Sequence, residues 1–248
     1  MLAELNLADV LVLDIECVSG TKSYEDMNPV MQSLWAGKSE QVQKSKAPEL
    51  RLSPADSYTE MAGIYSEYGK IVCVSVGAFY KNKETGELNF RLASYYGDDE
   101  KKLLEELAEM LNRRYYDPKK HRICGHNVKE FDIPYIARRM VINGVKLPAL
   151  FDLAGKKPWE NSALDTMELW KFGDNKAFTG LKVLCGVFGI PTPKDDIDGS
   201  QVGYTYWQEN DLNRIEKYCR KDVLATAQVL LKFKYMPVLE PHQINGLD

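Results

Sequence analysis

The segment Val10–Val18 (VLVLDIECV) constrains the fold most, because two acids interrupt an otherwise continuous apolar run. Such a run of aliphatic and β-branched residues is typical of a buried strand in the middle of a sheet. Successive side chains point to opposite faces of a strand, so Asp14 and Glu16 lie on the same face. Two buried like charges are costly unless the carboxyl groups are uncharged and hydrogen-bonded, or a cation lies between them. Glu16 alone could mark the point where the strand emerges into solvent, but Asp14 has apolar neighbours on both sides.

Composition favours one domain. A chain of 248 residues, 44% of them hydrophobic, can bury a sizeable core, and no Pro-, Gly- or Ser-rich linker divides it. We therefore expect a single domain over residues 1–248. The net charge of −4 argues against a protein that holds nucleic acid mainly through a large basic surface. It does not exclude nucleic acid as a substrate, since bound divalent cations would reverse the local field.

The cysteines indicate a reducing compartment. They lie far apart and form no CxxC pair: Cys17, Cys73, Cys124, Cys185 and Cys219. Most of them are in apolar segments, which is typical of buried thiols rather than of disulfides or a zinc site.

The N-terminus carries no basic leader and its apolar run stops at Asp14, so we expect neither a signal peptide nor a membrane span. We expect a soluble, cytoplasmic protein.

The hydrophobic pattern of the remaining chain predicts a mixed α/β layout with helices flanking a central sheet. A polar, lysine-rich segment over about residues 19–69 is expected to form a helical insertion, either a lid over a site or cover for a sheet edge. In it, Ser53 caps a helix that begins at Pro54, and Gly69 ends the pattern. Strands are expected at 70–80, 88–96 and 121–125, the first two joined by a turn at 82–86. Helices are expected at about 98–114, 131–143, 164–170, 179–188 and 211–235, with a further capped start at 199–202. In the helix at 179–188, the residues expected to face inward are Leu181, Leu184, Val187 and Phe188.

Three more polar residues lie on elements that could meet the two acids. Asp132 opens a helix, where capping alone would explain an acid. Tyr218 and Asp222 are four residues apart on the last helix and stack along the flank of its apolar stripe. That flank is the border between core and solvent, where a cleft would lie. Packing in the core with a polar tip is the alternative role for Tyr218, and Asp222 one turn away favours a role in chemistry over it.

Written as D-x-E, N-x3-F-D and Y-x3-D, these fragments resemble the three exonuclease motifs of the DEDD superfamily, in its tyrosine (DEDDy) branch. The sequence is most similar to the exonuclease domain of family B DNA polymerases, and within that group to stand-alone polymerase-B-like 3′-to-5′ exonucleases. The resemblance spans roughly Asp9 to Phe233 and includes the stretches Leu181–Pro191 and Asp196–Val202, so we expect no polymerase in this chain. It implies a ribonuclease H-like fold.

The resemblance also implies a phosphodiesterase that uses two divalent cations. Its metal ligands would be four carboxylates, which suit Mg²⁺ or Mn²⁺: Asp14, Glu16, Asp132 and Asp222. Two such ions about 4 Å apart can stabilise the attacking and the leaving oxygens at phosphorus. Tyr218 would complete the catalytic set by positioning the attacking water.

Substrate contacts follow from the same resemblance. Main-chain groups around Ile15 and Cys17 would hold the terminal nucleotide, although Cys17 replaces a threonine that is frequent there. Asn127 and Phe131 would contact the substrate strand, with the ring of Phe131 stacking on a base. An ordinary core position explains Phe131 nearly as well. Asp165 is an extra acid between the second and third motifs, which we interpret first as a helix cap and second as support for the site.

We therefore expect a metal-dependent 3′-to-5′ exonuclease that releases nucleoside monophosphates, with the single-stranded 3′ end of DNA as its nucleic-acid partner and no membrane partner. An exoribonuclease is the alternative in the same class, because the sequence does not reveal how the site treats a 2′-hydroxyl. A non-catalytic nucleic-acid-binding module is the alternative from another class. Such a module would be expected to lose acids, and this chain keeps all four together with the tyrosine.

Overall fold

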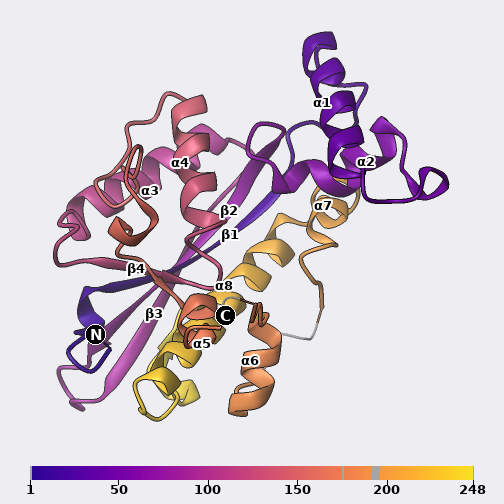
Figure 1. The fold of residues 1–248 in the computed structure, drawn as a ribbon. Helices are drawn as coiled ribbons and strands as arrows, with labels where there is room; N and C mark the ends of the chain where they lie inside the picture. The colour runs from indigo at the N-terminus through magenta and orange to yellow at the C-terminus, as the bar shows by residue number, and fades with distance from the viewer. Residues whose placement is uncertain (1, 175, 192–195, 248) are drawn as a thin grey trace.

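Six strands of the described residues form one mixed sheet in the order β5-β4-β1-β2-β3-β6. The computed structural model describes residues 2–174, 176–191 and 196–247 and is drawn in Figure 1. The strands are β1 (Val10–Ser19), β2 (Gly69–Lys81), β3 (Leu88–Tyr96), β4 (Arg122–Gly125), β5 (Leu164–Asp165) and β6 (Ile244–Asn245). β1, β2 and β3 are antiparallel neighbours, whereas β4 is parallel to β1 and β5 to β4. The predicted mixed α/β sheet, ribonuclease H-like in its strand order, is therefore confirmed.

β1 lies at the centre of the sheet because both of its faces are apolar. Leu11 and Leu13 are buried on one face, and Val10 and Val12 are buried on the other. β2 pairs with β1 over most of its length, but β4 pairs only with Val10–Val12. On the β4 side, main-chain groups of β1 from Leu13 onward therefore need partners other than a described strand.

Helices cover both faces of the sheet. α3 (Glu100–Arg114) and α4 (Asp132–Ile142) pack against the odd-numbered residues of β1. α8 (Leu212–Phe233) packs against the even-numbered residues, and Figure 1 shows it on the opposite side of β1 from α3 and α4. Asp14 and Glu16 are even-numbered, so the alternation of the strand turns both acids toward α8.

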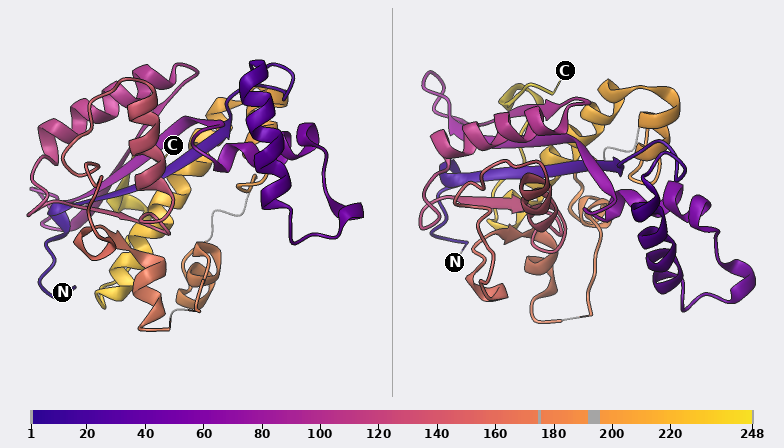
Figure 2. Two further views of the ribbon diagram at one scale, coloured as in Figure 1. Left: turned by 45° about the horizontal axis from the view of Figure 1, so that its top comes forward. Right: turned by 90° about the horizontal axis from the view of Figure 1, so that it is seen from above.

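Two helices lie between β1 and β2, namely α1 (Pro29–Val42) and α2 (Pro54–Met61). In Figures 1 and 2 they project beyond the end of the sheet that is farther from the N-terminus. Their own small core forms around Trp35, which is fully buried and donates its indole N–H to the carbonyl of Pro54 at 2.9 Å. Ser53 caps α2 as predicted. The expected continuation toward Gly69 is wrong, because a single 3₁₀ turn follows α2 and the chain then enters β2.

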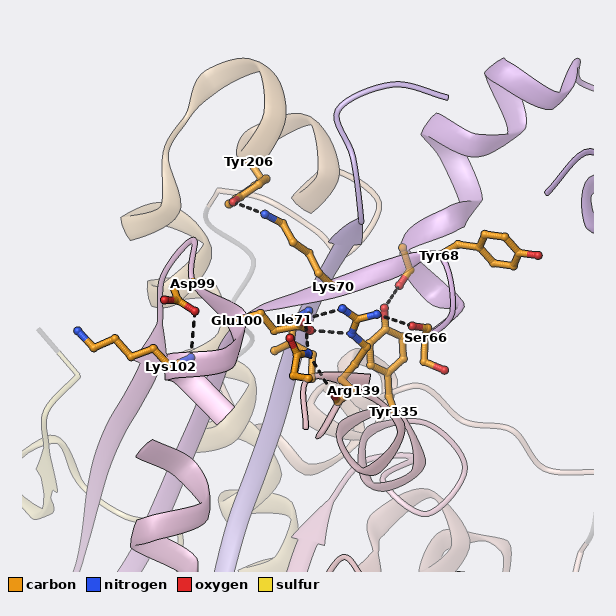
Figure 3. Close-up of polar contacts among 12 residues, drawn as sticks. Ser66, Tyr68, Lys70, Ile71, Asp99, Glu100, Lys102, Tyr135, Arg139 and Tyr206 are labelled. Carbon is orange, nitrogen blue, oxygen red and sulfur yellow. Dashed lines mark hydrogen bonds and ion pairs between the residues drawn. The ribbon is translucent and has the colours of Figure 1, made fainter. Parts of the chain in front are cut away.

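The end of this insertion is bonded to α4 by two side chains of that helix, one of which, Arg139, also forms a buried ion pair with Glu100 of α3, shown in Figure 3. Arg139 of α4 donates to both carboxylate oxygens of Glu100, at 2.8 and 2.5 Å, and to the carbonyl of Ser66 at 2.9 Å. Tyr135, one turn earlier on α4, donates its hydroxyl to the carbonyl of Gly63 at 2.7 Å. The helix that begins with Asp132 therefore carries the insertion on its far end.

The remaining helices differ in part from expectation. α5 (Thr166–Lys171) and α6 (Leu181–Phe188) form, but Val187 is 63% exposed rather than inward, because α6 buries only one narrow side against α8. α7 (Val202–Tyr204) has no side-chain cap and passes directly into a five-residue π-helix. β6 was not expected. None of the helices in the described residues has the length and apolarity that crossing a bilayer requires.

Candidate active site

The two acids of β1 meet a side chain of α8. Glu16 is 8% exposed and Asp14 is half-buried. The thiol of Cys219 on α8 donates to the main-chain carbonyl of Asp14 at 3.5 Å and to its carboxylate Oδ2 at 3.6 Å. Ligand atoms of these three residues all lie within 4.8 Å of one another. The sequence pattern placed Cys219 only in the apolar stripe of its helix, and its contact with Asp14 was not expected.

Asp132 reaches the same part of β1 from the opposite layer. It is the first residue of α4 and is 4% exposed. Its Oδ1 accepts a hydrogen bond from the main-chain N–H of Ile15 at 3.2 Å. β4 pairs with β1 only as far as Val12, so no described strand occupies this N–H. Helix capping alone therefore does not account for Asp132, which bonds across the sheet to the strand between the two acids.

Tyr218 and Asp222 complete the group from α8. Their side chains are one helical turn apart, and the charge of Asp222 acts on the tyrosine hydroxyl. Tyr218 is 9% exposed and Asp222 is half-buried. The structure thus brings together the four predicted acids and the predicted tyrosine from β1, α4 and α8.

Burial raises the pKa of all four acids, and the charges of the other acids add to the rise for Asp14 and Glu16. For Asp14, burial raises the pKa most, followed by the charges of Asp132, Glu16 and Asp222. Burial also dominates for Glu16, with the charge of Asp222 next. Burial raises the pKa of Asp132 to about 7, although the hydrogen bond from Ile15 opposes the shift. Each acid therefore resists ionisation while no cation is among them.

Burial also raises the pKa values of Asp222 and Tyr218. Burial raises the pKa of Asp222, while the hydroxyl dipole of Tyr218 and the ammonium of Lys182 on α6 act against the rise. Burial and the charges of Asp222 and Glu16 raise the pKa of Tyr218 well above its ordinary value. The tyrosine hydroxyl therefore keeps its proton at neutral pH.

The chemistry of these donors fits hard divalent cations. Within the described residues, none of the four acids forms an ion pair with a lysine or arginine. Carboxylate oxygens are the ligands that Mg²⁺ and Mn²⁺ prefer. Burial raises the pKa of Cys219 well above its ordinary value, so its thiol stays neutral and acts as a hydrogen-bond donor to Asp14 rather than as a soft ligand.

The residues predicted to contact substrate differ in how deeply they are buried and in which groups they contact. The N–H of Ile15 is occupied by Asp132, as described above. Cys17 packs against the core on the α3 and α4 side, and burial raises the pKa of its thiol well above its ordinary value. Phe131 is half-buried with its ring 5.4 Å from the ring of Tyr135, so it belongs partly to the core. Asn127 adopts a left-handed backbone with φ of 61°, at the edge of a large groove.

Asp165 holds the loop that leads to Asp132. It caps α5 as predicted, accepting from the N–H groups of Met167 and Glu168. Its carboxylate also accepts from the N–H of Asn127 at 2.9 Å and of Lys129 at 3.1 Å. The cap has a local signal in the sequence, but the bonds to the loop join segments far apart in the chain and have none.

Comparison with known proteins matches residues 64–242 to a family described as "Predicted 3'-5' exonuclease related to the exonuclease domain of PolB". The matched stretch contains Asp132, Tyr218 and Asp222 and begins after β1. No curated protein matches the sequence. Among solved structures, the family B DNA polymerase from the hyperthermophilic archaeon Pyrobaculum calidifontis is similar with a TM-score of 0.49 and 17% identity, over 90% of this chain and 24% of the polymerase. The chain thus spans about a quarter of the length of that protein.

Proposed function

Because the chain belongs to the family of predicted 3′-5′ exonucleases related to the exonuclease domain of PolB, we propose that it is a metal-dependent exonuclease that shortens single-stranded DNA from its 3′ end. The observation that carries this proposal is the meeting of four buried or half-buried carboxylates from three elements, with no cationic side chain paired to them in the described residues. Residues 1–248 would act as one exonuclease domain, with the insertion at about 19–69 as part of it.

The cofactor of this proposal is a pair of divalent cations, Mg²⁺ or Mn²⁺. They would be held by Asp14, Glu16, Asp132 and Asp222, whose four negative charges balance the four positive charges of two cations. When bound, the cations stabilise the attacking and the leaving oxygens of an in-line displacement at phosphorus. Without them, nothing at the acids would attract the phosphates of the substrate, and any carboxylate that does ionise would repel them.

Tyr218 would orient the attacking water. Its hydroxyl is one helical turn from the carboxylate of Asp222, and its phenolic oxygen has lone pairs that can accept a hydrogen bond from water. The raised pKa argues against a tyrosinate that removes a proton. Orientation of the water is therefore the role that its environment supports.

Two other groups would hold the carboxylates in place. The N–H of Ile15 fixes Asp132 against β1, and the thiol of Cys219 does the same for Asp14 from α8. Contacts to the terminal nucleotide are proposed for the main chain around Ile15 and Cys17, apart from the Ile15 N–H. Asn127 and Phe131 remain proposed contacts to the substrate strand, the ring by stacking on a base.

The proposal is tested by incubating 5′-labelled DNA and RNA oligonucleotides with the protein and Mg²⁺ or Mn²⁺. We expect a ladder that shortens stepwise from the 3′ end with wild type, and no ladder with Asp14→Ala or Asp222→Ala. Asp152→Asn is the matched control, because this acid is exposed and lies outside the cluster. A ladder on RNA alone would assign an exoribonuclease. Binding without shortening under every metal would instead favour a non-catalytic module.

A further inference from the structure

A groove of about 960 Å³ runs beside the candidate active site. It lies between α4, the loop over residues 147–161 and α5, and it extends from Asn127 to Ile142 at the far end of α4. None of the four acids lines it. Asn127 lies five residues before Asp132, so one end of the groove adjoins the loop that carries this acid.

Two large rings line this groove although they are mostly exposed. Trp159 is 77% exposed and Phe178 is 72% exposed, and they come from separate loops. Each ring has an ammonium group over it, Lys157 at 5.1 Å from the centre of the Trp159 ring and Lys171 at 4.3 Å from that of Phe178. Exposed aromatic rings gathered in one concave surface indicate a binding site, and a cation beside each ring indicates an anionic ligand.

Most charged side chains of the groove that have no ion-pair or hydrogen-bond partner in the described residues are positive. Its cationic side chains without an ion pair in the described residues are Arg138, Lys156, Lys157 and Lys171. Two of its acids are already satisfied, since Lys129 pairs with Glu168 at 2.5 Å and Asp165 accepts main-chain N–H groups. Glu67 and Glu130 are its remaining acids. The groove is thus a local basic surface on a chain whose net charge is −4.

We propose that this groove binds the single strand of nucleic acid that continues from the 3′ end held at the four acids. The inference rests on the proposed function and names the path of its substrate. Rings that stack on bases, combined with cations that contact the backbone, are the features by which proteins hold single strands. α4 is 11 residues long, about 16 Å at 1.5 Å per residue. That length accommodates about five nucleotides at a spacing of ~3.4 Å.

The first test measures binding without catalysis. In EDTA the four acids lack cations, so a fluorescein-labelled twelve-nucleotide strand should be held by the groove and not by the acids. We expect the Trp159→Ala/Phe178→Ala variant to weaken this binding about tenfold or more, because stacking contributes about 1–3 kcal/mol per base. Lys157→Glu/Lys171→Glu should weaken it too and flatten its salt dependence. Asp222→Asn should not weaken it.

Matched controls and an activity measurement complete the test. Tyr116→Ala and Lys102→Glu change an exposed ring and an exposed lysine outside the groove and should leave binding unchanged. With Mg²⁺, both groove variants should raise KM for the twelve-nucleotide strand while kcat/KM for a dinucleotide, which is too short to reach the rings, stays at the wild-type value.

The outcomes separate this inference from the proposed function. If wild type shortens the strand but the groove variants bind and cleave it as wild type does, the groove is not the path of the substrate. If wild type binds the strand in EDTA through the groove but never shortens it, the exonuclease proposal fails and the groove assignment stands. Lys157→Glu/Lys171→Glu changes one exposed and one half-buried lysine and removes no residue of a hydrophobic core, so it keeps the test decisive if the ring variant does not fold.

Discussion

The main-chain N–H of Ile15 donates a hydrogen bond to the carboxylate of Asp132 at 3.2 Å, across 117 positions of sequence. This bond ties the start of α4 to the strand between Asp14 and Glu16. It places an acid from one layer of the fold beside two acids that face the other layer. The pairing of β4 with β1 ends at Val12, so no described strand of that side bonds the N–H of Ile15. The candidate active site depends on this early end of the pairing, because it leaves the N–H to Asp132.

Asp132 should make the stability of the metal-free protein depend on pH. Its pKa in the folded protein is about 7, above the ordinary aspartate value. A carboxyl group whose pKa is raised on folding contributes stability that is fully present at pH values below its ordinary pKa. This contribution is lost as the pH rises through its pKa in the folded protein, which is about 7. In EDTA, the melting temperature of wild type should therefore fall more between about pH 5 and pH 8 than that of Asp132→Asn, which keeps the acceptor for Ile15. Equal falls in the two proteins, measured by calorimetry, would contradict this role of Asp132.

Tyr218→Phe should lower turnover with little effect on metal binding. The variant keeps the ring in its packed position but removes the hydroxyl, which is one helical turn from Asp222. Loss of an orienting group is expected to lower kcat about 100-fold. The Kd for Mn²⁺, measured by titration calorimetry, should stay within about twofold of wild type. A kcat equal to that of wild type would remove the tyrosine from the mechanism.

Asp165→Ala should destabilise the fold and slow the reaction together. The carboxylate accepts main-chain N–H groups from the loop at Asn127 and Lys129 as well as from α5. Removing it should lower the free energy of unfolding by about 3 kcal/mol, because buried N–H groups lose a charged partner. Urea unfolding checks this value. Asp174→Ala is the control, since that exposed carboxylate accepts a single N–H, from Lys176. If both variants lose the same stability, Asp165 has no special part in holding the loop.

Arg139, held in place by its ion pair with Glu100 of α3, should anchor the insertion through its bond to Ser66. Both side chains are largely buried, at 12% and 7% exposure, and Arg139 also bonds the carbonyl of Ser66. Arg139→Met should cost about 3–5 kcal/mol by leaving a buried carboxylate unpaired. It should also speed proteolysis near Ser66. Arg139→Met/Glu100→Gln should recover part of the stability, whereas additive losses in the double variant would mean that the pair is not the anchor.

Local patterns in the sequence accounted for the main elements and for the side of each element that carries an acid. Alternation in β1 put Asp14 and Glu16 on one face, and the helical repeat in α8 put Tyr218 one turn from Asp222. These features depend only on strand and helix periodicity. The predicted metal ligands and catalytic residues do come together, but their roles remain proposals.

Contacts between distant segments had no such signal. The bond from Cys219 to Asp14 and the bonds from Arg139 to Ser66 and Glu100 depend on how helices dock on the sheet, which no local pattern encodes. The exposure of Val187 has the same origin, because helical spacing does not say how wide a face the neighbouring α8 will cover. The two-residue β6 is too short to produce a periodic pattern.

The most direct test of the central claim is a titration of the metal-free protein with Mn²⁺, followed by calorimetry and electron paramagnetic resonance. We expect two Mn²⁺ ions per chain for wild type and for the control Asp152→Asn, with proton release on binding because the carboxyl groups have raised pKa values. Asp14→Asn and Asp222→Asn should each lose at least one ion. Binding of the same number of ions with the same affinity in all four proteins would show that these carboxylates do not share cations, and would contradict the account.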